Sequence, residues 1–141
     1  MNYKYQQDYN LLVIPCPPID YQPKNIDSAY RWVFDDIQDS RNFLPQYHRK
    51  PQRFLHKEDI DKCKGMALSL FSNFDGALKR YAELKDFMGS NISRTLGTQI
   101  AEGSLSEEDG VNGEMERLGH FSHHSSSSAS YVEKFSIVQK L

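Results

Sequence analysis

Three histidines stand within five positions late in the chain, in the stretch GHFSHHSSSSAS from Gly119 to Ser130. Imidazole side chains bind metals and ordinarily titrate near neutral pH, so such a cluster could hold an ion or move protons. On an extended strand, His120 and His124 would share one face and His123 would lie on the other. The first two would be ~13 Å apart at ~3.3 Å per residue, too far to ligate one ion. The pattern therefore predicts no metal site and an incidental histidine cluster on the surface.

His120 is the most informative of the three, because it stands between Gly119 and Phe121 at the expected start of a strand. An imidazole in that position could line a cleft and take part in proton transfer. The alternative is a structural histidine that is held by hydrogen bonds. We treat His120 as a candidate binding residue.

A second candidate site is the sequence YHRKPQRFLHK from Tyr47 to Lys57, which we call the basic segment. Its lysines and arginines, interleaved with aromatic rings, suit a phosphate ligand or single-stranded nucleic acid. The net charge of −2 makes the whole molecule a poor nucleic-acid binder. The acidic tract from Glu102 to Glu116 instead favours a protein partner that recognises complementary charge. The expected binding residues are Tyr47, Arg49, Lys50, Arg53 and Phe54, together with His120.

The overall composition is that of an ordinary folded protein of one domain, with 38% hydrophobic and 26% charged residues in a chain of 141. Two cysteines, Cys16 and Cys63, cannot form a disulfide framework; they could make one bridge, but we expect free thiols in a reducing compartment. No apolar run approaches the ~20 residues that cross a bilayer, and no secretory signal is visible. These features predict a cytoplasmic protein that does not associate with membranes.

The first half of the chain is expected to alternate extended, helical and irregular structure. In the extended N-terminal segment, residues 1–25, the alternation of Tyr9, Leu11 and Val13 predicts a short strand that Pro15 ends. Apolar residues at helical spacing favour a helix over residues 26–37. The alternative is a strand over AYRWVF, residues 29–34, which is rich in aromatic and β-branched side chains. Residues 44–57 contain two prolines and no regular period, which predicts an ordered loop.

The most regular unit spans residues 65–88. GMALSLF alternates as a buried strand does, and the helical period that follows predicts a helix over residues 72–88, begun by a capping box of Ser72 and Asp75. Further strands are expected in RTLGTQIAEGSL, GHFSH and KFSIV, with a mobile serine-rich loop at residues 125–130. This order indicates a single α+β domain with a mostly antiparallel sheet and one or two packed helices. The expected core of the regular unit is Leu68, Leu70, Leu78, Tyr81 and Leu84.

Three stretches occur in a recognisable order, with AYRWVF early, ALSLFSNFDGALKRY in the middle and IAEGSL later. This order resembles that of ADP-ribosyltransferase-like domains, which place an arginine or histidine on an early strand, a serine on a middle strand and a glutamate late. By analogy, the resemblance implies a nucleotide-dependent transferase that uses Arg31, Ser69 and Glu102. The serine-threonine-serine run usual in those domains is absent from this chain.

The sequence contains no cofactor loop, no metal-ligand set and no complete catalytic motif. We therefore expect a small binding or adaptor protein that acts through protein–protein interaction, with no cofactor and no catalysis of its own. The transferase is the alternative function. It requires Arg31, Ser69 and Glu102 to converge in one pocket, whereas a binding protein needs only an exposed patch.

Overall fold

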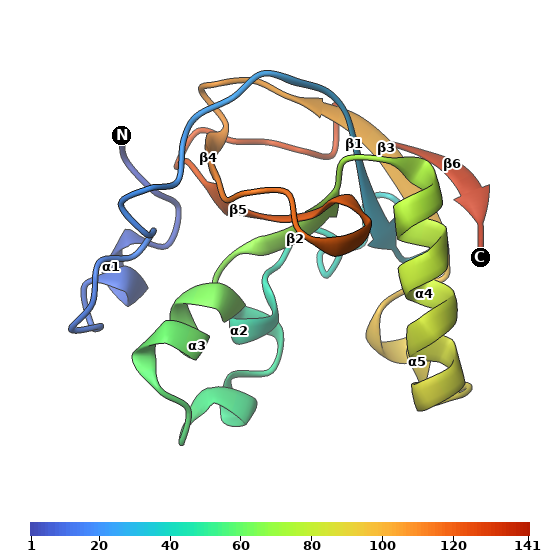
Figure 1. The fold of residues 1–141 in the computed structure, drawn as a ribbon, viewed down its shortest axis with the longest axis horizontal. Coiled ribbons are helices and arrows are strands. Elements are labelled where there is room, and N and C mark those ends of the chain that lie inside the picture. The colour runs from blue at the N-terminus through green and yellow to red at the C-terminus, as the bar shows by residue number, and fades with distance from the viewer.

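A computed structural model describes all 141 residues and contains one antiparallel sheet of six strands with helices beside it (Figure 1). The predicted α+β fold with a mostly antiparallel sheet is confirmed. In spatial order the strands are β4 (Gly110–Asn112), β5 (His120–Ser125), β2 (Leu68–Phe71), β1 (Ile26–Val33), β3 (Gln99–Leu105) and β6 (Ser136–Lys140). The helices are α1 (Gln6–Tyr9), α2 (Gln46–Arg49), α3 (Asp59–Gly65), α4 (Phe74–Met88) and α5 (Asn91–Thr95), with 3₁₀ turns η1 (Pro51–Phe54) and η2 (Arg117–Gly119). None of the helices combines the length and the apolar character that a bilayer-spanning segment needs.

Residues 26–33 form the central strand β1, so the favoured helix over residues 26–37 is wrong and the alternative strand is confirmed. Ala29, Arg31 and Val33 are buried on one face of β1, and Tyr30 and Trp32 lie on the other. Both faces of this strand are covered, so large side chains occur at odd and even positions alike. That distribution imitates a helical period.

The unit of strand and helix over residues 65–88 is confirmed as β2 followed by α4. Leu68, Leu70 and Tyr81 are buried as expected, and Leu78 and Leu84 are half-buried. The helix is capped one residue later than predicted, because the Asn73 side chain accepts a hydrogen bond from the Gly76 amide at 2.6 Å.

The sheet buries apolar side chains on both faces. On one face Leu68, Leu70 and Phe121 pack with Tyr131 and Phe135 from the segment before β6. On the other face α4 covers Phe71 and Ile100, and Trp32 meets Tyr81 edge to face at 5.5 Å between ring centroids. The second face is not covered completely, because the Ser69 side chain of β2 is exposed there, so a pocket can form beside it or in a gap between strands.

The N-terminal segment contains α1 and a run of turns, so the strand predicted around Leu11 and Val13 is wrong. Leu11 is 78% exposed and Val13 is 93% exposed. The Val13 amide donates to the Asp59 carboxylate at 2.8 Å, and the only β-type backbone pairing of the segment is through single bridges at Tyr3 and Gln22. Alternation produced no strand here because no neighbouring strand lies alongside to pair with it.

Cys16 and Cys63 form a disulfide, so the expectation of two free thiols is wrong. The bond joins the N-terminal segment to α3, across 47 residues of sequence. The disulfide joins two distant segments, and the spacing of cysteines in a sequence does not reveal which distant segments pack together. A cross-link over a long loop stabilises a fold mainly by restricting the unfolded chain, typically by ~2–4 kcal/mol.

The packing of β2 makes a direct test of the core assignment. Leu70 is 1% exposed, so replacing it with alanine removes buried methyl groups and leaves a cavity. We expect Leu70→Ala to lower the free energy of unfolding by ~2–5 kcal/mol in urea melts. Leu11→Ala, at an exposed position, is the matched control and should change it by less than ~0.5 kcal/mol. Equal effects of the two changes would show that β2 is not part of the core.

Candidate functional site

The sheet splits between β1 and β2, and Arg31 spans the split. These strands have one position in register, Tyr30 with Phe71, whereas β1 and β3 pair along their length. Beyond that position the Arg31 guanidinium donates from Nη1 to the Ser69 carbonyl at 2.8 Å and from Nε to the Asn42 carbonyl at 2.6 Å. The side chain of Arg31 therefore takes the place of the missing backbone pairing.

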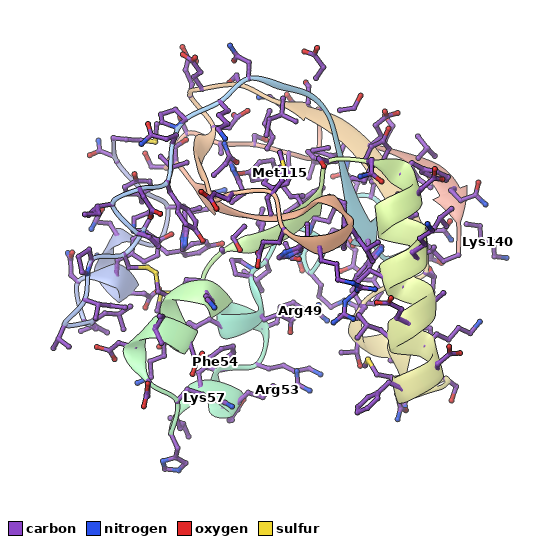
Figure 2. The ribbon with its side chains drawn as sticks, in the orientation of Figure 1. Arg49, Arg53, Phe54, Lys57, Met115 and Lys140 are labelled. Atoms are coloured by element: carbon purple, nitrogen blue, oxygen red, sulfur yellow. A yellow bond between two sulfur atoms is a disulfide. The ribbon has the colours of Figure 1, made fainter.

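A cavity of about 570 Å³ opens at this split, and we call it the arginine cleft. It falls in the range of roughly 300–1,000 Å³ that small-molecule sites occupy. Arg31, Arg41, Arg49 and Arg53 line it, and the facing wall includes Leu84, Phe87 and Met88 of α4. Figure 2 shows Arg49 and Arg53 extending from the segment of α2 and η1 toward the side of the molecule that carries α4. The cleft thus has a cationic wall and an apolar wall.

The positive charge of the arginine cleft is largely uncompensated. Arg41 pairs with Asp39, whereas Arg31, Arg49 and Arg53 have no carboxylate within 4.0 Å. Burial lowers the pKa of Arg31 to about 10, and the neighbouring Arg49 contributes to that shift. Burial and the charge of Arg41 likewise lower the pKa of Arg49. With these lowered pKa values Arg31 and Arg49 still stay protonated at neutral pH, so the cleft carries a positive potential that attracts anions.

The structure brings only part of the basic segment to this cleft. Arg49, Arg53 and Phe54 line it, whereas Tyr47 and Lys50 do not. Tyr47 packs against Phe54 with ring centroids 5.3 Å apart, and both rings are half-buried. The predicted loop over residues 44–57 contains α2 and η1, which hold Arg49 and Arg53 on the same side of the segment.

A second candidate site lies beside Ser69, where three side chains form a chain of contacts. Ser69 Oγ is 2.5 Å from Nε2 of His120, and Nδ1 of His120 is 3.2 Å from Oε1 of Glu116. Together with Trp32, Arg80 and Arg117, these residues line a cavity of about 500 Å³, which we call the histidine pocket. Ser69 lines both the histidine pocket and the arginine cleft, so the two sites adjoin.

Strand register places Ser69 and His120 side by side. Antiparallel β2 and β5 pair Ser69 with Ser122 and Phe71 with His120, so Ser69 and His120 are diagonal neighbours on one face of the sheet. The Phe71 ring meets the His120 ring edge to face at 5.5 Å between centroids, which restrains the imidazole.

The turn that carries Glu116 is fixed against the start of α4. A Cβ atom on Gly76 would lie 1.8 Å from the Leu118 carbonyl oxygen, so only glycine permits this approach. Gly119 adopts φ +78° and accepts a hydrogen bond from the Ser72 amide at 2.8 Å. The Glu116 amide in turn donates to the His120 carbonyl at 2.6 Å. These contacts hold the Glu116 side chain near the imidazole.

His123 and His124 are buried, so the predicted surface cluster is wrong for these two residues. The two ring nitrogens of His123 contact Asn112 Oδ1 and the Tyr131 hydroxyl, each at 2.7 Å. Nδ1 of His124 is 2.8 Å from the Tyr9 hydroxyl. Both are structural histidines, whereas His120 lines the histidine pocket.

His124 lies next to both cysteine sulfurs, with the three possible ligand atoms within 4.8 Å of one another. The sulfurs are bonded to each other, however, and it is the thiolate form of cysteine that binds metal ions. This cluster therefore cannot serve as a thiolate metal centre in the disulfide-bonded protein.

The serine-rich stretch at residues 125–130 packs against the sheet at several points. Ser125, Ser126 and Ala129 are buried. The Ser126 hydroxyl donates to the Glu108 carbonyl at 2.7 Å, and the Tyr131 hydroxyl donates to Ser125 Oγ at 2.6 Å. These bonds hold the chain between β5 and the segment before β6.

The structure does not bring Glu102 together with Arg31 and Ser69. Glu102 lies on β3 and accepts a hydrogen bond from the Tyr30 hydroxyl at 2.8 Å. Tyr30 is on the face of β1 opposite Arg31. Glu102 lines neither the arginine cleft nor the histidine pocket, and the glutamate nearest Ser69 through His120 is Glu116.

No family model, curated protein or solved structure matches this chain. What the fold and the two sites define is an α+β protein whose sheet opens into an arginine-rich cleft next to a histidine pocket. The sequence analysis did not identify Glu116, which lines the histidine pocket, or Arg41, which lines the arginine cleft. Glu116 stands four residues before His120, but only the turn between them makes that spacing a contact.

The buried histidines predict how stability depends on pH. Burial lowers the pKa of His123 to about 4 and that of His124 to about 3, from an ordinary value of 6.5. Between pH 6.5 and 5, His123 and His124 become protonated in the unfolded chain but stay neutral in the folded protein. We therefore expect the free energy of unfolding to fall between pH 6.5 and 5, with a slope approaching ~1.4 kcal/mol per pH unit for each histidine.

Urea melts of the wild type and two variants test this prediction. His124→Gln should lower stability at pH 7.5 but should flatten the slope between pH 6.5 and 5, because one of the two groups no longer titrates. His56→Gln is the matched control, since His56 is exposed, and it should leave the slope unchanged. A wild-type stability that stays constant across this interval would contradict the burial of both imidazoles.

Proposed function

We propose that the protein binds a phosphate-bearing small molecule of the nucleotide class in the arginine cleft. The observation that carries this proposal is the guanidinium of Arg31, which lines the cleft at 9% exposure with no carboxylate partner. This function is closer to the nucleotide-dependent alternative than to protein binding.

An anion would complete the hydrogen bonding and the charge balance of Arg31. A buried cation is costly unless an opposite charge or a full set of acceptors compensates for it. Two carbonyl oxygens accept from Nε and Nη1, whereas Nη2 of this cleft-lining residue has no protein acceptor. A guanidinium presents paired donors in a plane, and phosphate oxygens match that geometry.

Two further arginines extend this anion site along one wall. Arg49 and Arg53 come from α2 and η1, and neither has a carboxylate partner. The positive charges of these arginines repel one another, and the charge of Arg49 contributes to the lowered pKa of Arg31. A ligand with two or more negative charges relieves this repulsion, so a diphosphate or triphosphate fits better than a single carboxylate.

The apolar lining favours a ligand that also carries a ring. Trp32, Phe54 and Phe87 all line the arginine cleft, and Phe87 is 91% exposed on α4. A large aromatic side chain exposed at the mouth of a cleft offers a stacking surface, and base stacking on such rings stabilises by ~1–3 kcal/mol. Together the aromatic rings and the arginines match a nucleobase joined to phosphates.

Protein binding by the basic segment remains a separate proposal. Arg49 and Arg53 line a concave site, and Tyr47 and Phe54 pack on each other, which favours a small ligand over a flat protein surface.

The cytoplasmic location also remains a proposal. The Cys16–Cys63 bond is an observation against it, because disulfides persist mainly in oxidising compartments.

The single tryptophan of the chain provides a direct binding assay, because Trp32 lines the cleft. We expect ADP and ATP to change its fluorescence with saturation, and adenosine to bind far more weakly. Raising the salt concentration should weaken nucleotide binding, since the attraction is electrostatic. Failure of ADP, ATP and inorganic pyrophosphate to bind at millimolar concentration would refute the proposal.

Matched variants locate the anion site. Arg49→Gln should weaken ADP binding about tenfold or more, because it removes a charge-assisted hydrogen bond. Lys57→Gln removes an equal charge from the end of the basic segment that does not line the cleft, and it should have little effect. Similar losses in both variants would mean that ADP responds to the general charge of the segment and not to the cleft.

A second substitution tests the stacking surface. Phe87→Ala should weaken ADP binding about tenfold while leaving the affinity for inorganic pyrophosphate unchanged, because only ADP carries a base. Folding is not at risk, since the Phe87 side chain is almost fully exposed. Equal loss for both ligands would contradict a stacking role.

A further inference from the structure

The contacts in the histidine pocket form an ordered path for a proton. A carboxylate only accepts hydrogen bonds, so the Nδ1 of His120 that faces Glu116 must carry the hydrogen. In the neutral imidazole Nε2 is then an acceptor, and the Ser69 hydroxyl donates to it across 2.5 Å. This is the arrangement in which a histidine can remove the proton of a serine hydroxyl.

We propose that Ser69 is a nucleophile, that His120 is its general base, and that Glu116 is the positioning residue that orients the imidazole. The geometry matches the serine–histidine–acid arrangement of hydrolytic enzymes, which recurs on unrelated folds and is defined by contacts and not by sequence order. Here the acid comes from a turn, the base from β5 and the nucleophile from β2.

Access to solvent separates this site from a structural serine–histidine pair. The Ser69 side chain is exposed on a strand whose other side chains are buried, and it lines the histidine pocket and the arginine cleft. His123, which lies on β5 with His120, provides the contrast. It is fully buried, and both of its ring nitrogens are occupied by neutral partners. His120 instead contacts a hydroxyl and a carboxylate at the edge of a cavity.

The pocket also contains positive charge for a developing oxyanion. Arg80 and Arg117 line it, and both guanidiniums pair with Glu83, which ties them to α4. In acyl transfer, donors near the carbonyl oxygen stabilise the tetrahedral intermediate. The Ser69 carbonyl is held by Arg31, so the strand position of the nucleophile is fixed as well.

The reaction class that fits these groups is ester hydrolysis through an acyl-serine. Ser69 Oγ attacks the ester carbonyl carbon while its proton passes to Nε2 of His120. The C–O bond to the leaving alcohol then breaks, and His120 returns the proton to the departing oxygen. Water attacks the acyl-serine, releasing the carboxylic acid and restoring the hydroxyl. The expectation that the natural ester carries phosphate rests on the proposed function of the arginine cleft, whereas the attack by Ser69 does not.

An uncharged fluorophosphonate probe tests the nucleophile without involving anion binding. Ser69 Oγ would displace fluoride and form an O–P bond, with the proton passing to His120. We expect intact-protein mass spectrometry to show one adduct per chain, and peptide mapping to place it on Ser69. Absence of any adduct on the folded wild type after hours at millimolar probe would overturn the proposal.

Three variants assign the roles. Ser69→Ala should abolish labelling, and His120→Gln should slow it about 100-fold, as loss of a general base does. Glu116→Gln should slow it less and shift its pH profile, because the imidazole loses the charge that orients it. Ser122→Ala is the matched control, since Ser122 pairs with Ser69 across the strands but takes no part in the hydrogen bonds among Ser69, His120 and Glu116, and it should label at the wild-type rate.

Two results distinguish catalysis from a merely structural contact. Circular dichroism and urea melts should show that the three variants remain folded, so that loss of labelling reports chemistry. Labelling of the His120→Gln variant at the wild-type rate would overturn the assigned base. The Trp32 titration with ADP is an independent measurement, so a failure of nucleotide binding and a failure of the Ser69 chemistry can be recognised separately.

Discussion

The guanidinium of Arg31 lies where the sheet stops being continuous, and the arrangement of the cleft depends on the two backbone carbonyls to which this side chain donates. Strands β1 and β2 separate after one paired position, and the Arg31 side chain donates to the Ser69 carbonyl on β2 and to the Asn42 carbonyl in the connection after β1. One of these carbonyls belongs to Asn42, whose side chain also accepts from the Phe34 amide at 2.7 Å and donates to the Asp36 carbonyl at 2.8 Å. Arg31 therefore fixes both the split and the connection that follows β1.

That constraint also explains why so much positive charge gathers in one place. The connection fixed by Asn42 leads into α2 and η1, which deliver Arg49 and Arg53 to the same cavity as Arg31. Stability alone does not favour three guanidiniums without counter-ions, because each raises the cost of protonating the others. Local arrangements that cost stability are typical of functional sites, where a ligand supplies the missing interaction. We propose that an anionic ligand supplies this interaction in the arginine cleft.

The hydrophobic periodicity of the sequence predicted an element correctly where one face of that element is buried. The prediction failed where contacts between distant segments determined the structure. Unit β2–α4 alternates on one covered face and then follows a helical stripe, so its pattern could be interpreted correctly. Strand β1 is covered on both faces, which removed the alternation and favoured a helix instead. The disulfide depends on the packing of two distant segments, and the contact of Glu116 with His120 depends on the conformation of a turn. The spacing of residues in the sequence encodes neither. Arg31, Ser69 and His120 could be named from residue type or order, whereas the order that pointed to Glu102 does not specify the face of a strand and gave no indication of Glu116.

Ser69 connects the two sites through different atoms of one residue. Its carbonyl accepts from Arg31, which faces the arginine cleft, and its hydroxyl donates to His120 in the histidine pocket. A ligand anion that draws the Arg31 guanidinium into the cleft would act on the backbone of β2 at the residue that carries the nucleophilic oxygen. Under the two proposals, binding of the anionic part of a substrate and positioning of the Ser69 hydroxyl are linked within one residue. Trp32 and Leu84 also line both cavities, so we propose that one extended molecule occupies them together, with its phosphates among the arginines and its ester beside Ser69.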